Sequence, residues 1–423
     1  MIFSHGLGGG RNSYSYIAGS LASHGVVVVC PEHRDGSAVT TFMRMPNQKP
    51  TDFKSRVIPY QRHPHDASPE VFAARDKQLR IRLWEMGLLH QAVLALDRLF
   101  NLTNLNTSTT GLGQFAGKLH VNDPGSIIWA GHSFGATTMT SLLKSTYYAD
   151  RPDVANMEKP LFQPSKNSEI RKQITDRSVT MLLDMWSMPM LSPDTSVLFN
   201  LPLPLYDDKP TAAGGKALLA VESDAFFKWK EHLNVKARLL SPDPSAAVVS
   251  AQSFERPSGI KMEEPNFFYV VSSAHLSQSD FGILFPWLTK KIFNAQQPER
   301  ALRLNLRAQL QILRTNDYSV ARTSTSDLVD GSSLEEEKGA KNGAEDPMTA
   351  GGLNDDTAIF SRNGDKVDCW KWIDIIGLGS ANKDESGKTV TEKVEEGEQD
   401  IKGEMEPSEQ ESKPLARTLS AAA

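Results

Sequence analysis

Short aliphatic runs alternate with helical patterns along the first 300 residues or so of the chain. Residues 26–30 form a continuous apolar run between Gly25 and Pro31, which is typical of a buried strand. Residues 69–100 carry apolar side chains three or four positions apart, which predicts a helix. The other predicted strands are 126–130, 179–183, 217–221 and 267–271, and the other predicted helices are 14–23, 136–148 and 280–293.

Alternating strands and helices predict an α/β fold, with a mostly parallel sheet covered by helices on both faces. We expect one catalytic domain over residues 1–322, with a polar insertion at 150–177. Beyond residue 322 Ser, Thr, Gly, Asp and Glu dominate, so we expect 323–377 to be mostly flexible, with an apolar island at 370–376 that docks on the domain. The acidic residues 378–423 are predicted to be a disordered tail, because they offer too little apolar surface to offset their ordering entropy.

Composition narrows the class of protein. A net charge of −5 argues against a nucleic-acid partner, which would leave a basic footprint. The 2 cysteines, Cys30 and Cys369, make no disulfide framework, so we expect a reducing, cytoplasmic setting. No apolar run reaches the roughly 18 residues of a membrane span. The chain opens on Met1 directly inside what looks like a strand-to-loop motif, so we expect upstream strands of the fold to be missing.

The strongest chemical signal is Gly131-His132-Ser133-Phe134-Gly135, which matches G-x-S-x-G. The pentapeptide alone is common, but here a predicted strand leads in and a predicted helix leads out. That setting is typical of the nucleophile elbow of an α/β-hydrolase, and it makes Ser133 the expected nucleophile. An incidental serine in a glycine-lined turn is the weaker interpretation.

A serine hydroxyl needs a base, and the base needs an orienting acid. Downstream of Ser133 there are only His232 and His275. His232 lies in a segment typical of a helix surface, whereas His275 follows a strand in a loop, so His275 is the expected base. For the acid, Asp184 and Asp224 both follow strands, at the edge where α/β sheets build their sites. The weaker candidates, in polar loops, are Asp176 and Asp194.

An oxyanion hole takes one N–H from the residue after the nucleophile, here Phe134, and a second from the loop after an earlier strand. His5-Gly6-Leu7-Gly8-Gly9-Gly10 fits that loop by composition, and Leu7 is the expected donor. A flexible glycine linker is the competing interpretation for the three consecutive glycines.

These motifs together resemble the platelet-activating factor acetylhydrolases, the group VII phospholipases A2. The resemblance spans about residues 1–295 and rests on the blocks Phe3-Ser4-His5-Gly6-Leu7-Gly8, Leu21-Ala22-Ser23-His24-Gly25, Pro31-Glu32-His33-Arg34-Asp35-Gly36-Ser37-Ala38, Gly131-His132-Ser133-Phe134-Gly135 and Leu183-Asp184-Met185-Trp186. The resemblance favours Asp184 over Asp224 as the acid, and the spacing Ser-x-x-His supports His275. The long stretch between Ser133 and Asp184 and the acidic tail depart from the family pattern.

The resemblance implies calcium-independent hydrolysis of the sn-2 acetyl or short oxidised acyl ester of a glycerophospholipid. We therefore expect a phospholipid substrate, weak peripheral membrane contact, and no metal or cofactor; the oligomeric state stays open. The methionine-rich stretch 181–205 fits an acyl pocket, ordinary core packing or a surface that meets lipid. His33-Arg34-Asp35 fits a buried ion pair better than a phosphate contact. The alternatives are a carboxylesterase or lipase of the same fold and, with less support, a non-catalytic lipid-binding protein.

Overall fold

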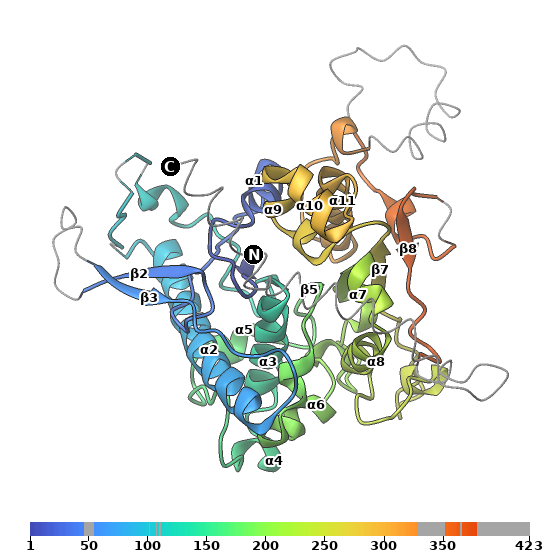
Figure 1. Ribbon diagram of the computed structural model, residues 1–423. Coiled ribbons are helices and arrows are strands. Elements are labelled where there is room, and N and C mark those ends of the chain that lie inside the picture. Colours follow the sequence, from blue (N-terminus) through green and yellow to red (C-terminus); the bar gives the residue numbers. More distant parts are fainter. Residues whose placement is uncertain are drawn as a thin grey trace.

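A six-stranded sheet forms the centre of the computed structural model, which describes residues 1–45, 55–100, 102–106, 108–109, 111–328, 352–363 and 366–378. The strand order is β1-β4-β5-β6-β7-β8 (Figure 1). The strands are β1 (Ile2–Ser4), β4 (Trp129–His132), β5 (Thr180–Leu183), β6 (Leu218–Ser223), β7 (Asn266–Val270) and β8 (Trp370–Trp372). The first five are mutually parallel, and β8 runs antiparallel to β7. The predicted mostly parallel sheet of the α/β-hydrolase type is confirmed.

Helices cover both faces of the sheet and bury a separate hydrophobic cluster on each. One face is covered by α2 (Pro69–Asp97), α3 (Phe134–Tyr147), α4 (Pro152–Ala155), α5 (Glu169–Gln173), α6 (Ser196–Asn200) and α8 (Lys230–Leu239). The opposite face is covered by α1 (Ser15–Ser23) and α11 (Pro298–Thr315). Three short helices, α7 (Asp224–Lys228), α9 (Phe281–Leu284) and α10 (Pro286–Phe293), follow strands β6 and β7. A hairpin of β2 (Thr40–Arg44) and β3 (Ser55–Pro59) stands apart from the sheet (Figure 1).

Several elements differ from the pattern predicted from the sequence, and three of them adjoin the sheet or the candidate site. Residues 26–30 pair only through Val29, which bridges to Ile2, because the neighbouring strand β1 has just three residues. The single helix expected over 280–293 is two helices, since Pro286 has no N–H and clashes with a preceding turn. Helix α11 was not predicted, although Pro298 at its first turn and its buried leucines are ordinary helix signals.

The described residues beyond 322 contribute to the core. Ile359, Val367 and Trp370 are buried in the cluster that also holds α11. The carboxylate of Asp356 forms a fully buried ion pair with Arg307 of that helix. Most of the predicted tail, 379–423, lies outside the described residues.

Candidate active site

Ser133 sits on the turn between β4 and α3, in a backbone conformation that side chains rarely adopt. Its φ is +54° and its ψ is −121°, a region that costs of order 1–3 kcal/mol. Glycine is required on both sides. A Cβ on Gly135 would lie 2.0 Å from the carbonyl oxygen of Ser4, and one on Gly131 would lie 2.5 Å from the backbone of Gly135. The G-x-S-x-G spacing is therefore a steric requirement of this turn.

Asp184 follows β5 and is hydrogen bonded to His275, with 3.0 Å between Oδ2 and Nδ1. His275 begins the short 3-10 helix η7 (His275–Gln278) that follows β7. The other carboxylate oxygen of Asp184 accepts the backbone N–H of Ser223 at 2.5 Å. Asp184 is fully buried and His275 is nearly so. Parallel strands thus deliver the acid, the base and the serine to one edge of the sheet.

Two aromatic rings hold the imidazole of His275. Phe226 of α7 stacks on it with centroids 4.3 Å apart and an interplanar angle of 5°. His132, the residue before Ser133, lies 4.5 Å away at 35°. The hydroxyl of Tyr14 accepts the N–H of Gly6 at 3.0 Å and shares a second hydrogen bond, of 2.8 Å, with Nδ1 of His132. This contact links the glycine loop to the ring that packs on His275.

Burial sets the protonation of this group. It lowers the pKa of His275 below its usual value, and the nearby Lys236 ammonium lowers it further. Burial raises the pKa of Asp184, and the charge of Lys236 opposes that rise. His275 is therefore neutral at pH 7, the state in which an imidazole can accept a proton.

Where the oxyanion hole was expected, two backbone N–H groups of the described residues have no hydrogen-bond acceptor. Gly6 and Gly8 donate to the Tyr14 hydroxyl and the Ser37 carbonyl. In contrast, within the part of the chain that the structure describes, the N–H groups of Leu7 and Phe134 donate to no acceptor. Gly6 also approaches the serine closely, because a Cβ built on it would lie 2.9 Å from the Cβ of Ser133.

A cavity of about 380 Å³ opens onto these residues. Its floor contains Leu7, His132, Ser133 and His275, and its apolar wall comes from α9 and α10. The side chains of that wall are Phe281, Leu284, Leu288, Ile292 and Phe293. Serine and base therefore meet at the floor of one largely apolar pocket.

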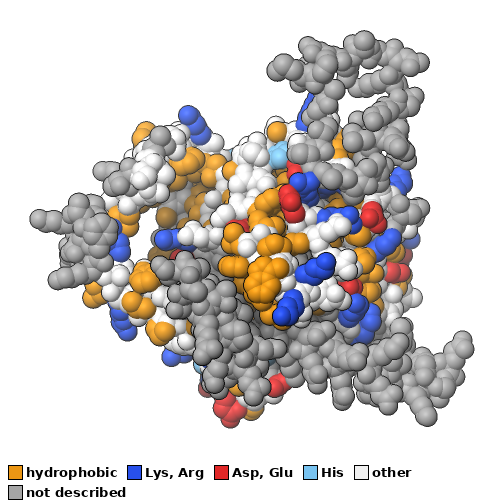
Figure 2. Space-filling model, turned by 45° about the horizontal axis from the view of Figure 1, so that its top comes forward, with side chains coloured by type: hydrophobic (Ala, Val, Ile, Leu, Met, Phe, Trp, Pro, Cys, Tyr) orange, Lys and Arg blue, Asp and Glu red, His pale blue; other side chains and the backbone are white. Residues whose placement is uncertain are grey.

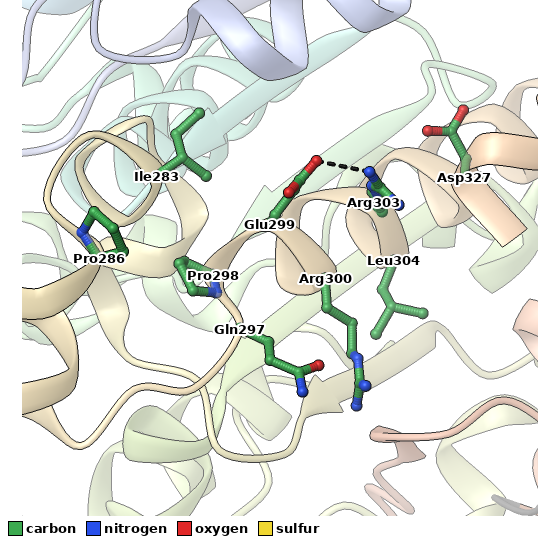
Figure 3. A pocket seen from close by; sticks show the side chains of 9 residues that line it. All are labelled: Ile283, Pro286, Gln297, Pro298, Glu299, Arg300, Arg303, Leu304 and Asp327. Carbon is green, nitrogen blue, oxygen red and sulfur yellow. Dashed lines mark hydrogen bonds and ion pairs between the residues drawn. The ribbon is translucent and has the colours of Figure 1, made fainter. Parts of the chain in front are cut away.

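A second cavity, of about 430 Å³, lies at the start of α11 (Figure 3). Arg303 is paired with Glu299 there, and Arg300 and Asp327 also line it. Its lining contains no histidine, serine or cysteine. This second cavity is therefore not a candidate for nucleophilic chemistry.

The competing acid and base are engaged elsewhere. Asp224 forms an ion pair with Lys228 at 2.9 Å and accepts the N–H of Ser272. His232 is buried in α8, not on its surface as expected, and its Nε2 accepts the N–H of Ser187 at 2.8 Å. The carboxylate of Asp224 and Nε2 of His232, which an acid and a base would need for catalysis, are therefore already engaged in other contacts.

The remaining weaker acids, Asp176 and Asp194, bond to Thr211 and Lys159. Neither residue lines the pocket that holds Ser133. They therefore stay outside the site, as expected for residues of polar loops.

The predicted structural role of the His33-Arg34-Asp35 block agrees with its contacts. Nδ1 of His33 and the guanidinium of Arg34 both bind Glu85 of α2. Asp35 forms a fully buried ion pair with Arg82 at 2.7 Å. Arg82 also donates to the carbonyl of His5 at 2.8 Å, so the ion pair fixes the start of the glycine loop.

The stretch 181–205 packs in the core rather than lining the pocket. Met181, Met185, Trp186, Met188 and Met190 are all buried, and none of them lines the cavity above Ser133. Core packing, the second interpretation, is therefore right. The acyl-pocket interpretation is wrong, because the apolar wall comes from the later helices α9 and α10.

Sequence analysis missed several residues that shape the site. His132 lies inside the G-x-S-x-G motif itself, but nothing local assigns it a contact. Phe226 lies in α7 and Tyr14 immediately before α1, and their contacts depend on the tertiary fold. The sequence around each residue gives no signal of these contacts.

Within the described part of the chain, one group of three potential metal ligands lies close together, namely His132, Asp184 and His275. Atoms of all three are already used in hydrogen bonds with one another or with Tyr14. The set therefore fits a hydrogen-bonded catalytic group better than a metal centre. Among the described helices, none is long and apolar enough to cross a membrane.

Comparison with known proteins relates this chain to one group of enzymes. Residues 1–197 match the family model described as platelet-activating factor acetylhydrolase, isoform II. That segment contains Leu7, Ser133, Phe134 and Asp184 and ends before His275. The resemblance inferred from the sequence motifs is confirmed.

Individual relatives match over different lengths. A putative phospholipase A2 of Schizosaccharomyces pombe is 25% identical over 335 residues, 74% of this chain and 67% of the relative. The platelet-activating factor acetylhydrolase of Bos taurus is 35% identical over 143 residues, 34% of this chain and 31% of the relative. That of Canis lupus familiaris is 27% identical over 250 residues, 59% of this chain and 45% of the relative. The chain thus spans less than half the length of these two mammalian relatives.

Proposed function

Because this chain is related to the platelet-activating factor acetylhydrolase family, we propose that it is a serine hydrolase of phospholipid esters. Its preferred bond is the sn-2 ester of a glycerophospholipid with an acetyl or short oxidised acyl chain. One observation carries the proposal: Ser133 lies on a strained turn at the floor of a pocket that it shares with a His275 bonded to Asp184.

Acylation follows from this arrangement. The Oγ of Ser133 attacks the ester carbonyl carbon while Nε2 of His275 takes the hydroxyl proton. Nδ1–H of His275 donates to Asp184, which stabilises the imidazolium as it forms. The unoccupied N–H groups of Leu7 and Phe134 receive the negative oxygen of the tetrahedral intermediate.

The intermediate collapses when the carbon–oxygen bond to glycerol breaks. His275 returns its proton to the leaving alkoxide, so the lysophospholipid departs as a neutral alcohol and the acyl group stays on Ser133. Water then repeats the sequence: His275 takes a proton from water as the water oxygen bonds to the acyl carbon. The bond from that carbon to Oγ of Ser133 then breaks, and His275 returns the proton to Oγ as the short acid is released. No metal enters either half-reaction.

The pH dependence follows from the burial of His275. Activity requires neutral imidazole, and burial lowers the pKa of His275. Activity is therefore lost as the pH falls through that lowered pKa, not through the usual value near 6.5. We expect the acid limb of the pH profile to lie below pH 6.5.

The apolar wall of the pocket continues onto the surface. Leu284, Trp287 and Ile292 of α9 and α10 are 66%, 60% and 38% exposed. Figure 2 brings the end of the molecule with these helices forward, and hydrophobic side chains gather on that face among basic and acidic ones. Exposed apolar side chains beside a pocket support weak docking at a lipid surface, from which a substrate would enter directly.

The test is a substrate series on the purified chain. We expect rapid release of acetate from an acetylated alkyl-glycerophosphocholine and rates that fall steeply as the sn-2 chain lengthens. Equal rates on acetyl and long-chain phospholipids would indicate a general lipase. Turnover of soluble esters without any phospholipid cleavage would indicate a carboxylesterase.

Ser133→Ala is the matched control for that series. We expect it to fold and to lose several orders of magnitude in turnover, because only oxyanion-hole catalysis would remain. An organophosphate should label the wild-type chain at Ser133. Near-normal hydrolysis by the alanine variant would contradict the proposal.

A further inference from the structure

A buried charge pair lies behind Asp184. Glu222 of β6 is 1% exposed and Lys236 of α8 is fully buried, and the two form a direct ion pair. Removing two charges from water carries a large desolvation cost that an apolar pair of the same size avoids. A pair at this position therefore calls for a role other than stability.

Asp184 is tied to the backbone on both sides of Glu222. The N–H of Asp184 donates to the carbonyl of Val221 at 2.7 Å, and its carboxylate accepts the N–H of Ser223 at 2.5 Å. Burial raises the pKa of both Asp184 and Glu222, and the charge of Lys236 lowers both. Among the described residues, no hydrogen-bond donor reaches Oε1 of Glu222.

Lys236 also lies against the ring that packs on the base. Its ammonium lies 4.7 Å from the ring centroid of Phe226, the ring on which His275 stacks. The other titratable side chains facing this cluster are His132 from β4 and His232 from α8, and burial lowers the pKa of both. At pH 7 the cluster therefore combines two carboxyl groups with one cation.

We propose that Lys236 and Glu222 are positioning residues for the reaction: the Lys236 cation keeps Asp184 ionised, and Glu222 holds that cation in place. This proposal rests on the proposed function, since it assigns the pair to the same serine, base and acid. Neither residue lines the pocket, so both act through Asp184 and His275.

The charges give the reason. Because the Lys236 ammonium opposes the effect of burial, it favours the ionised form of both carboxyl groups. Without Lys236 that opposing charge is lost, and the two carboxyl groups take up a proton more readily. A protonated Asp184 no longer accepts the Nδ1–H of His275, so the imidazole loses its orientation and its stabilising partner.

The experiment compares pH–rate profiles of the full chain in three variants. Lys236→Met should lower kcat/KM at pH 7 at least about tenfold and move the acid limb up by about one pH unit or more, because both Asp184 and His275 then protonate more readily. Glu222→Gln removes a negative charge, so the acid limb of its pH–rate profile should stay at the same pH or move to lower pH. The double variant Glu222→Gln/Lys236→Met should fall between them and recover activity relative to Lys236→Met.

Lys228→Met is the control, because Lys228 is an exposed lysine paired with Asp224; its profile should match wild type. If Lys236→Met does not fold, the step from Glu222→Gln to the double variant still measures the effect of Lys236 and should move the acid limb up. Absence of that shift, or shifts of the same sign in both single variants, would overturn the proposal.

A measurement without substrate separates this inference from the proposed function. The imidazole nitrogens of His275 can be titrated by NMR in the resting protein. Removing Lys236 should raise the pH at which His275 protonates, whether or not any ester is turned over. An unchanged His275 titration in a folded variant would refute the role of Lys236, while absent hydrolysis by wild type would refute only the function.

Discussion

The two halves of the candidate site are constructed in different ways. The nucleophile half consists mostly of backbone: a positive φ at Ser133, glycines with no room for a side chain, and the N–H groups of Leu7 and Phe134. The base half consists of side chains, with His275 held by Asp184 from another strand and stacked on Phe226 from a helix.

The difference shows what each half tolerates. A backbone site is specified by sterics, so it needs glycine at fixed positions, and an added methyl group displaces the loop. A side-chain site is specified by charge and stacking, so the loss depends on which of these two a substitution removes. Three substitutions test this contrast.

The largest effect is expected in the base half, from Asp184→Asn. The amide preserves size but would present a donor to His275 and favour the wrong tautomer, so turnover should fall by roughly 10⁴. Asp224→Asn is the control, because Asp224 pairs with Lys228 and not with His275. The turnover of an ester substrate is measured for both variants. A larger loss from Asp224→Asn would assign the role of the acid to the residue that follows β6 instead of β5.

A smaller effect is expected from Gly6→Ala in the backbone half. The added Cβ would lie 2.9 Å from the Cβ of Ser133, so the loop that carries the Leu7 N–H must shift. Loss of one oxyanion donor typically costs about 10²–10³ in kcat, and we expect a loss near the lower end with KM little changed. Gly19→Ala, where a Cβ meets nothing within 4 Å, should behave as wild type. Equal activity of the two variants would show that the loop is not held against the serine.

The smallest effect is expected from Phe226→Leu. The leucine fills similar space but gives His275 no flat ring to stack on, so we expect about a fivefold loss of kcat, which corresponds to a stacking energy of about 1 kcal/mol. Phe227→Leu is the control, since Phe227 stacks on Tyr269 and not on the base. Steady-state kinetics on a soluble ester check this, and a loss as large as that of Asp184→Asn would mean that stacking, not charge, orients His275.

The contrast also explains what the sequence could predict. The alternation of strands and helices was enough for the sheet, and Gly131 to Gly135 was enough for the serine, because both depend on local periodicity and sterics. The contacts of Phe226, Tyr14 and Lys236 depend on which helices pack at the carboxyl edge, and no local pattern carries that information. The catalytic roles of Ser133, Asp184 and His275 stay predictions for the experiments above.

His232 illustrates the opposite failure. The polar residues around it predicted a helix surface, yet it is buried with its ring stacked on Trp229. Helix α8 presents this residue and Lys236 inward because the charged cluster behind Asp184 lies on that side. A periodicity argument assigns polar residues to solvent and cannot anticipate a polar interior.

Strand β8 has a consequence for handling the protein. It hydrogen bonds along β7 and is the outermost strand of the sheet within the described residues. A chain cut before Trp370 would leave the backbone N–H and C=O groups on the outer edge of β7 without partners, next to newly exposed Phe268. An unprotected strand edge of this kind is a template for pairing between molecules. Removal of the acidic tail alone leaves β8 in place, whereas a truncation only slightly longer invites self-association.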